Sequence, residues 1–492
     1  MAPQDSGFIE RGLFIDNGWR PALDGERLEV IDPSDGSVFG SIARGRAADV
    51  GLAVESARRA FDGNGTADGR WGRTPPSERG RILARLGRAV EETAEELATL
   101  ESRDTGKPLR QARADALALA RYFEFYAGAA DKLHGQTVPY RQGYTVLTLR
   151  EPHGVTGHIV PWNYPMQILG RSVGASLAAG NACVVKPAED ACLSVLRVAE
   201  MAAACGLPPG ALNVVTGLGA EAGEALAAHP GIDHLSFTGS PVTGTRVAQV
   251  AAAHHCPVTL ELGGKSPQLV FADADLEAAL PALVGAIIQN AGQTCSAGSR
   301  VLVERSVHDA LLERLADTFA ALRAGPAGRD LDLGPMVSRR QQERVWDALS
   351  EAQSVGIRFA AQGQVVEDAP SGGFYQAPVL LADVPPGQRI EQEEIFGPVL
   401  AVTAFDAEAD AIRLANGTPY GLVAGVWTRD GARQLRLAHR LRAGQVFIND
   451  YGAGGGVELP FGGVKRSGYG REKGFEALYG FTTLKTVALR HD

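Results

Sequence analysis

A cysteine near the middle of the chain, Cys295, lies in a polar turn that contains a glycine, at residues 289–296. A thiol becomes a useful nucleophile when its thiolate is accessible and electropositively supported. The small neighbours Ala291, Gly292 and Ser296 leave room for a reacting carbonyl group. Because cysteine is also among the side chains most often buried as a small hydrophobe, a purely structural role is the alternative.

Two further polar residues lie at the ends of predicted strands. Asn163 is placed where a strand passes into a helix, so it could cap that helix or donate its side-chain amide to an oxygen that gains negative charge. Glu261 ends the apolar run 258–260, and the following Gly263 and Gly264 allow the backbone to approach a ligand. Glu261 is therefore a candidate general base, with a salt-bridge partner as the alternative.

Phosphate recognition has a weaker signature in this chain. The expected GxGxxG after the first strand is absent, and residues 217–223 come near it with one residue too many. The segment 237–240, Phe-Thr-Gly-Ser, follows a predicted strand and opens a helix, which presents free backbone N–H groups suited to a diphosphate. A plain turn is the alternative. One of Glu391, Glu393 and Glu394 could bind a ribose hydroxyl.

The elements that must position these residues alternate regularly from residue 155. We expect strands at 155–160, 182–185, 212–215 and 232–237, and helices at 166–179, 190–205, 220–228 and 242–253. Such alternation predicts a parallel, doubly wound sheet that binds ligands at the carboxyl ends of its strands. Upstream, Ser77 is expected to cap a helix that Gly106 and Pro108 stop, with a second helix reaching about residue 131.

Two short apolar, β-branched segments, 144–149 and 482–487, interrupt this pattern. They predict either a protruding two-part arm that serves a homo-oligomer interface or ordinary edge strands.

Composition excludes several classes of protein. The 492 residues suggest two or three domains, and the net charge of −9 without a long cationic run argues against nucleic acid as a partner. The five cysteines lack a CxxC pair, which favours a reducing compartment and argues against a structural zinc site; we expect no metal. Residues 1–11 lack the pattern of a signal peptide, and apolar stretches are interrupted. We therefore expect a cytoplasmic protein that has no membrane partner.

Together the motifs resemble the aldehyde dehydrogenase superfamily over nearly the whole chain. The matching segments are PWNYP at 161–165, KPAE at 186–189, FTGS at 237–240, ELGGKSP at 261–267, GQTCSA at 292–297, EEIFGPV at 393–399 and LPFGG at 459–463. The resemblance implies an α/β fold with a doubly wound parallel-sheet NAD-binding domain (1–130 and 153–261), an α/β catalytic domain (262–465) and a small β oligomerisation arm (131–152 and 466–492). It also implies NAD(P)-linked oxidation of an aldehyde through a thioester.

Site roles follow from the resemblance residue by residue. Cys295 resembles the nucleophile, Asn163 with the Cys295 backbone N–H the oxyanion hole, Glu261 the base, and Glu472 a second carboxylate near the water path. The residues expected to bind the cofactor are Val160, Trp162, Lys186, Glu189, Gly219, Gly223, Phe237, Gly239, Ser240, Leu262, Glu394 and Phe396. Those expected near the substrate are Tyr164, Gln167, Arg171, Thr294, Ser296 and Phe461.

Cofactor and substrate preference rest on single residues. A carboxylate at Glu189 that accepts from a ribose 2′-hydroxyl would repel a 2′-phosphate, so we expect NAD rather than NADP. Gln167 and Arg171 lie four and eight residues after Asn163, on nearly one helix face. Arg171 resembles the arginine of succinate-semialdehyde dehydrogenases and could bind a substrate carboxylate, or it could be structural. A CoA-acylating dehydrogenase and a non-catalytic NAD-binding protein are the alternative functions.

Overall fold

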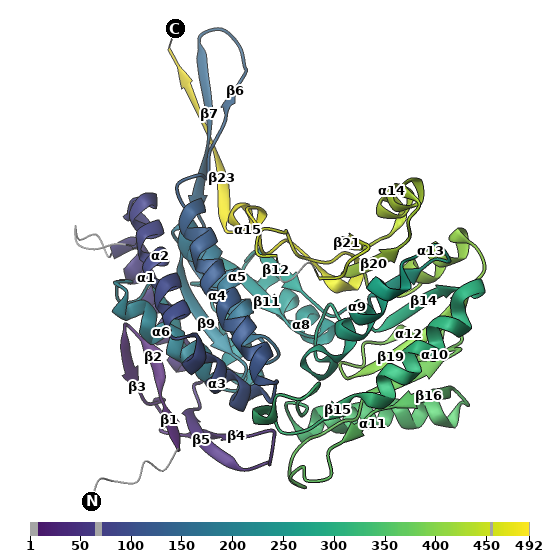
Figure 1. Cartoon of the computed structure of the whole chain (residues 1–492). Coiled ribbons are helices and arrows are strands. Elements are labelled where there is room, and N and C mark those ends of the chain that lie inside the picture. The colour runs from purple at the N-terminus through teal and green to yellow at the C-terminus, as the bar shows by residue number, and fades with distance from the viewer. Residues whose placement is uncertain (1–7, 64–70, 453–455, 492) are drawn as a thin grey trace, which may run out of the picture.

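The computed structural model describes residues 8–63, 71–452 and 456–491. The first seven residues of the segment 1–11 therefore lie outside the described residues. In Figure 1 the chain forms two α/β halves, with a narrow β arm projecting from one of them.

The first half is built on an eight-stranded sheet in the order β22-β12-β11-β8-β9-β10-β2-β3. Its central strands are parallel: β8 (Val155–Val160), β9 (Ala182–Pro187), β10 (Leu212–Val214), β11 (His234–Thr238) and β12 (Val258–Glu261). Antiparallel strands close the two edges: β2 (Leu13–Ile15), β3 (Gly18–Arg20) and β22 (Gly468–Tyr469).

Helices cover both faces of this sheet because the side chains of each strand alternate between two cores. Cys183 and Val185 belong to one core, and their neighbours Ala182 and Val184 belong to the other. The covering helices are α1 (Ala47–Asp62), α2 (Pro76–Glu92), α3 (Ala94–Thr105), α4 (Leu109–Ala129), α5 (Pro165–Ala179), α6 (Leu193–Ala204), α7 (Glu224–Ala228) and α8 (Pro241–Ala252). The predicted alternation from residue 155 to 253 is confirmed.

The helices before residue 155 differ from those predicted. The single helix expected between Ser77 and Gly106 is two helices, α2 and α3, which meet at Thr93. Thr93 leaves helical geometry at φ −107° and ψ 17°, and its hydroxyl donates back to the carbonyl of Ala89. The helix also begins at Pro76 and not with a Ser77 cap, because proline needs no partner for an N–H in the first turn.

The second half is built on a seven-stranded sheet in the order β16-β18-β19-β14-β13-β20-β21. Its strands are β13 (Pro267–Val270), β14 (Arg300–Glu304), β16 (Arg358–Gln362), β18 (Val379–Ala382), β19 (Val399–Phe405), β20 (Val423–Trp427) and β21 (Gln445–Ile448). Its helices are α9 (Leu276–Ile288), α10 (Arg305–Ala321), α11 (Arg339–Ser354), α12 (Arg389–Gln392), α13 (Glu408–Asn416) and α14 (Gly431–Arg440). Only the edge pair β16 and β18 is antiparallel within this sheet.

The arm is a three-stranded sheet of β6 (Thr137–Val138), β7 (Tyr144–Pro152) and β23 (Thr482–Arg490). β7 and β23 pair antiparallel over their full lengths, and Figure 1 shows them extending away from the body. The segments 144–149 and 482–487 thus lie in neighbouring strands of one small sheet. The first part of the segment 466–492, which was expected in the arm, is not part of it. There β22 joins the first sheet, and α15 (Glu476–Gly480) precedes the arm strand β23.

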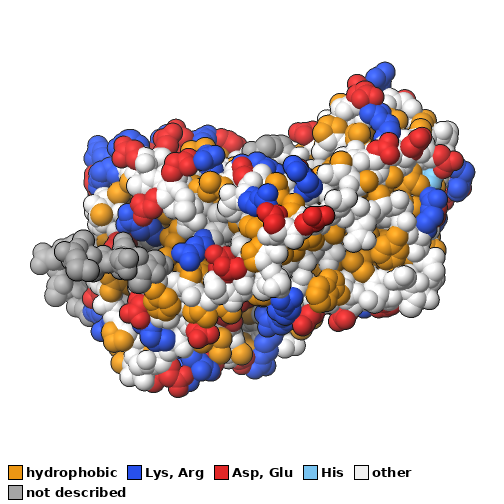
Figure 2. All heavy atoms as spheres, turned by 60° about the horizontal axis from the view of Figure 1, so that its bottom comes forward, with side chains coloured by type: hydrophobic (Ala, Val, Ile, Leu, Met, Phe, Trp, Pro, Cys, Tyr) orange, Lys and Arg blue, Asp and Glu red, His pale blue; other side chains and the backbone are white. Residues whose placement is uncertain are grey.

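Small sheets complete the described chain: β1 (Ile9–Arg11), β4 (Arg27–Ile31) and β5 (Val38–Ala43) form one, and β15 (Arg323–Ala324) and β17 (Gln364–Val365) form another. None of the helices in the described ranges is long and apolar enough to span a lipid bilayer. On the face drawn in Figure 2, basic and acidic side chains are interspersed.

Candidate active site

Two cavities meet at Cys295. One, of about 180 Å³, lies at the carboxyl ends of β8, β11 and β12 and is lined by Trp162, Ser240, Glu261 and Glu394 among others. We call it the strand-end cavity. The other, of about 560 Å³, lies along α4 and α5 and is called the α4/α5 cavity. Cys295 lines both cavities, so one residue borders two binding spaces.

The loop that carries Cys295 has an unusual and well-supported backbone. After α9, Asn290 and Ala291 adopt positive φ of 49° and 52°, and Gly292 follows at 74°. A Cβ on Gly292 would lie 2.2 Å from the carbonyl of Gly397, so only glycine fits there. Asn290 Nδ2 donates to the carbonyl of Asn163 over 2.9 Å, which ties the loop to the first half of the molecule.

Asn163 directs its side chain to the same loop. Its Nδ2 donates to the carbonyl of Gln293 over 3.0 Å, and the residue lines the strand-end cavity. The alternative that Asn163 caps α5 is wrong, because Tyr164 occupies the cap position and no side chain closes that helix end. The side-chain amide of Asn163 is therefore bound to the backbone two residues before Cys295, and it does not cap α5.

Glu261 is buried at the end of β12 and lines the strand-end cavity with Cys295. Neither carboxylate oxygen has a hydrogen-bond partner among the described residues. Burial raises the pKa of Glu261 well above its usual range, the charge of Glu472 raises it further, and Arg171 opposes both effects. An ionised Glu261 is consequently a stronger base than an ordinary glutamate.

Burial also raises the pKa of the Cys295 thiol, to about 11, although the positive charge of Arg171 lowers it. The protein alone therefore holds the sulfur as a thiol near neutral pH. A base or an added positive charge must favour the thiolate before it can attack.

Of the three glutamates expected near a ribose, only Glu394 lines the strand-end cavity. Glu391 binds Arg300 over 2.7 Å, and Glu393 binds Arg389 over 2.8 Å. Glu394 accepts from the backbone N–H of Gly264, and burial raises its pKa to about 7.

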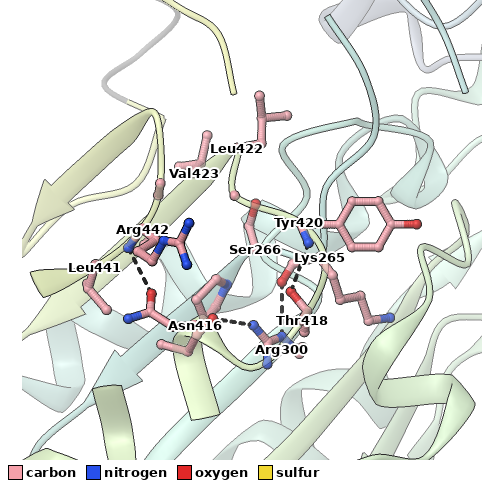
Figure 3. Close-up of a pocket in the computed structure, with 15 residues that line it drawn as sticks. Lys265, Ser266, Arg300, Asn416, Thr418, Tyr420, Leu422, Val423, Leu441 and Arg442 are labelled. Atoms are coloured by element: carbon pink, nitrogen blue, oxygen red, sulfur yellow. Dashed lines mark hydrogen bonds between the residues drawn. The ribbon is translucent and has the colours of Figure 1, made fainter. Parts of the chain in front are cut away.

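Arg300, the partner of Glu391, also binds three backbone carbonyls. Figure 3 shows its guanidinium among backbone oxygens, where it donates to the carbonyls of Lys265, Leu414 and Ala415. The small pocket beside it, of about 10 Å³, includes Arg300, Lys265 and Ala415 in its lining. Through its bond to Lys265, Arg300 thus holds the start of β13, the strand that follows Glu261, in place.

The other predicted cofactor residues fall into three groups. Gly239 and Ser240 lie at the start of α8, where Ser240 Oγ accepts from the N–H of Thr243, and Trp162 contacts Phe396 edge to face at 5.3 Å; all four line the strand-end cavity. The side chains of Val160, Phe237 and Leu262 belong to the hydrophobic cores.

Lys186 and Glu189 lie outside the lining of the strand-end cavity, at the end of the adjacent strand β9. Lys186 Nζ is 2.7 Å from Glu189 Oε2, and a Cβ on Gly223 would lie 3.8 Å from the Lys186 side chain. Burial would raise the pKa of Glu189, but Lys186 and the N–H of Gly219 hold it below its usual value. These residues form one polar cluster beside the cavity.

All six predicted substrate residues line the α4/α5 cavity. The hydroxyls of Tyr164 and Thr294 are 2.8 Å apart, and Gln167 Nε2 donates to Asp115 over 2.6 Å. Arg171 lies in the wall, where its Nε is 2.5 Å from Glu472 Oε2 and its Nη2 donates to Thr238. Its positive charge is thus balanced inside the protein.

Glu472 lines neither cavity. It is fully buried, binds Arg171 and accepts a hydrogen bond from the hydroxyl of Ser236. The charge of Glu472 raises the pKa of Glu261, so the two carboxylates interact electrostatically.

Several lining residues have no counterpart in the predicted set. In the α4/α5 cavity they include Asp115, Tyr122, Tyr451 and Lys473, and in the strand-end cavity they include Ser338, Gln341 and Arg344 near the start of α11. On α4 the signal was present: Gln111, Asp115, Ala118 and Tyr122 recur at helical spacing and therefore share a face. Within the described ranges, no three His, Cys, Asp or Glu side chains group in a way that could hold a metal ion.

The aldehyde dehydrogenase family model matches residues 19–487. This chain belongs to the aldehyde dehydrogenase family. A hydroxyisobutyraldehyde dehydrogenase of Mycolicibacterium austroafricanum is 41% identical over 97% of this chain and 93% of its own. As an aldehyde dehydrogenase, the chain is an oxidoreductase whose fold class is the one expected.

Two solved aldehyde dehydrogenase structures are close to this one. A putative aldehyde dehydrogenase from Burkholderia cenocepacia is 70% identical, with a TM-score of 0.96 over 98% of this chain and 100% of that one. An aldehyde dehydrogenase from Bacillus cereus, solved as an NAD+ complex, is 38% identical with a TM-score of 0.95 over 98% and 97% of the two chains.

Proposed function

We propose that this aldehyde dehydrogenase oxidises an aldehyde to its carboxylic acid with NAD, through a thioester on Cys295 that water hydrolyses. The observation that carries the proposal is the position of Cys295 at the junction of two cavities. A nucleophile in that place contacts an aldehyde from one side and a hydride acceptor from the other.

The strand-end cavity and the polar cluster beside it together suit a dinucleotide. The lining of the cavity runs from the start of α8, where the Ser240 hydroxyl and the positive end of the helix dipole suit a diphosphate, to Trp162, Phe396 and Cys295. Glu394 supplies a ribose acceptor, and the cluster of Lys186 and Glu189 lies at the next strand end for the second ribose. Bound NAD supplies the acceptor for the hydride that leaves the tetrahedral carbon.

The residues of the chain perform the remaining steps. Cys295 loses its proton, and its sulfur forms a bond to the aldehyde carbon while the carbonyl oxygen becomes an alkoxide. The side-chain amide of Asn163 and the backbone N–H of Cys295 donate to that oxygen. Loss of hydride re-forms the C=O bond and leaves a thioester.

Glu261 then takes a proton from water as the water oxygen attacks the thioester carbon, and the Cys295 sulfur leaves. The net reaction consumes one aldehyde, one NAD+ and one water and releases the carboxylate, NADH and two protons. The unpartnered carboxylate of Glu261 in the cavity supports this role.

A CoA-acylating reaction, in which a second thiol takes the acyl group, needs no such base. The burial of Glu261 beside Cys295 supports hydrolysis over this alternative. Measuring NADH formation from butyraldehyde with and without CoA tests it: hydrolysis predicts full turnover without CoA, and dependence on CoA would reject it.

Glu189 supports NAD over NADP, because a carboxylate facing a ribose 2′-oxygen repels a phosphate there. We further propose that the first half binds the dinucleotide, that the second half presents Cys295, and that the β arm joins subunits of a homo-oligomer. The exposed apolar residues of the arm, Tyr140, Leu149, Leu484 and Leu489, support an interface.

A further inference from the structure

A buried ion pair lies close to the proposed base. Arg171 Nε is 2.5 Å from Glu472 Oε2, and only 8% and 0% of the two side chains are exposed. Such a pair adds little to stability, because the cost of removing both charges from water largely offsets their attraction. Charged groups buried at an active site more often adjust the acids and bases around them. The position of the pair relative to Glu261 therefore decides what it does.

Strand β11 holds both members of the pair on the face that carries Glu261. Ser236 and Thr238 lie two residues apart on β11 and therefore face the same side of the sheet. The hydroxyl of Ser236 donates to Glu472 over 2.5 Å. The hydroxyl of Thr238 accepts from Arg171 Nη2 over 3.1 Å. Because Thr238 is the register partner of Glu261 on β12, the pair and the base lie on one face.

The backbone that carries Glu472 also packs against Glu261. Phe461 and Glu472 form an antiparallel bridge, with N–H···O distances of 2.6 and 2.8 Å. The next residue, Gly462, has a φ of 153°, and a Cβ there would lie 2.8 Å from Glu261 Oε1. The carboxylate of Glu261 therefore lies directly over this backbone, and the charge of Glu472 is close to it.

The charged and titratable groups that face Glu261 come from several parts of the chain. They are Glu472, Arg171, Arg471 and, across the strand-end cavity, Cys295 and Glu394. Burial raises the pKa of Glu261 most, the charge of Glu472 raises it further, and Arg171 and then Arg471 lower it. The two members of the ion pair thus have opposite effects on the same carboxylate.

Arg171 is the cation that sequence alone favours for a substrate carboxylate, but its environment argues against that role. It lines the α4/α5 cavity, whereas its partner Thr238 lines the strand-end cavity, so it lies between the two. Its guanidinium is 5.0 Å from the centre of the Phe461 ring. A substrate carboxylate that reached Arg171 would also approach the buried negative charge of Glu472.

We propose that Arg171 and Glu472 are a positioning pair for the base, in which Arg171 favours the ionised form of Glu261 and Glu472 limits that effect. Glu261 accepts the proton of water only when it is ionised, so hydrolysis slows as the pH falls through its pKa. Removing Arg171 should move this loss to higher pH, and removing the charge of Glu472 should move it to lower pH. This inference rests on the proposed function of Glu261.

The test follows the pH dependence of acyl-enzyme hydrolysis. Butyraldehyde and NAD react in a single turnover, and rapid quenching with mass spectrometry measures how fast the butyryl group leaves Cys295 between pH 5.5 and pH 9. Arg171→Met should shift the acid limb of this profile upward by about one pH unit or more, the usual effect of losing an opposite charge near a carboxylate. Glu472→Gln should shift it downward by about half a unit to one unit, because it removes a like charge.

Two further variants separate charge from packing. Arg171→Lys keeps the positive charge and should return the acid limb to within about half a unit of the parent. Ser236→Ala is the matched control, because it removes a hydrogen bond to Glu472 and no charge. Its acid limb should also stay within about half a unit. If Arg171→Met does not fold, the difference between Glu472→Gln and Ser236→Ala decides the question.

Unmoved limbs in Arg171→Met and Glu472→Gln, or shifts in the same direction, would overturn the inference, because a merely structural pair predicts them. An Arg171→Met variant that keeps the parent limb and loses kcat/KM only for succinic semialdehyde would overturn it in favour of substrate binding. Both outcomes leave the proposed function intact. The function itself fails if the butyryl group leaves Cys295 as fast in Glu261→Gln as in the parent.

Discussion

The side-chain amide of Asn163 donates to the backbone carbonyl of Gln293 over 3.0 Å, which joins the end of β8 to the loop of Cys295. Two residues 130 positions apart are thereby held in one site. The contact places the proposed oxyanion donor and the nucleophile in one rigid unit. Replacing Asn163 tests both its chemistry and its hold on the loop.

Asn163→Ala should lower kcat by about 10²–10³, the usual effect of removing one oxyanion donor. Steady-state NADH formation measures it. Asn290→Ala is the matched control, because it removes a bond to the same loop and leaves the Asn163 amide present. A loss in Asn163→Ala no larger than in Asn290→Ala would show that the side chain only positions the loop.

Alkylation of Cys295 should become faster with rising pH. Burial raises the pKa of its thiol to about 11, so the reactive thiolate increases about tenfold per pH unit below that value. Iodoacetamide labelling between pH 6.5 and 8.5, followed by peptide mass spectrometry, measures this rate. A labelling rate that does not change over this range would contradict the assigned environment of the sulfur.

Glu189→Gln should raise the ratio of kcat/KM for NADP to that for NAD by about tenfold, because it removes one negative charge near the 2′ position. The parent enzyme should favour NAD. A parent with equal or higher kcat/KM for NADP would refute the assignment of Glu189.

Lys107→Met should destabilise the fold by about 3–5 kcal/mol, because Glu101 and Asp115 would remain buried without their cation. Denaturant unfolding measures the change. Lys132→Met, which removes an exposed lysine beyond the other end of α4, should stay within about 0.5 kcal/mol. Equal effects of the two substitutions would rule out a structural role for the buried triad.

Leu484→Asp on the arm should lower the mass of the particle measured by light scattering, because it places a charge in the proposed subunit interface. Thr483→Asp changes the opposite face of β23, which carries Leu489 and the cross-strand neighbour Leu149, and so tests that face separately. An unchanged mass in Leu484→Asp would argue that this face of the arm does not join subunits.

Sequence predicts the first sheet well because its signal is local. Buried parallel strands such as β8 are short apolar runs between helices, and each can be identified without knowing its neighbours. The break at Thr93 has no such local signal, because no glycine or proline marks it and the Thr93 hydroxyl bonds back to the carbonyl of Ala89.

Pairings between distant segments could not be read from the sequence. Arg171 and Glu472 each suggest a substrate or water contact when considered alone, and only the fold shows that they bind each other. The same holds for Glu391 and Glu393, whose arginine partners leave Glu394 to line the cavity. Local patterns thus predict which polar residues lie at strand ends, but not which of them form ion pairs with other side chains.

The central claim is that an acyl group rests on Cys295 until Glu261 activates water. Glu261→Gln mixed with NAD and butyraldehyde should release about one NADH per site in a burst and then slow, as expected when hydrolysis limits turnover. Intact-protein and peptide mass spectrometry should then find one butyryl group, on Cys295. Undiminished turnover without an adduct, or an adduct on another residue, would contradict the account.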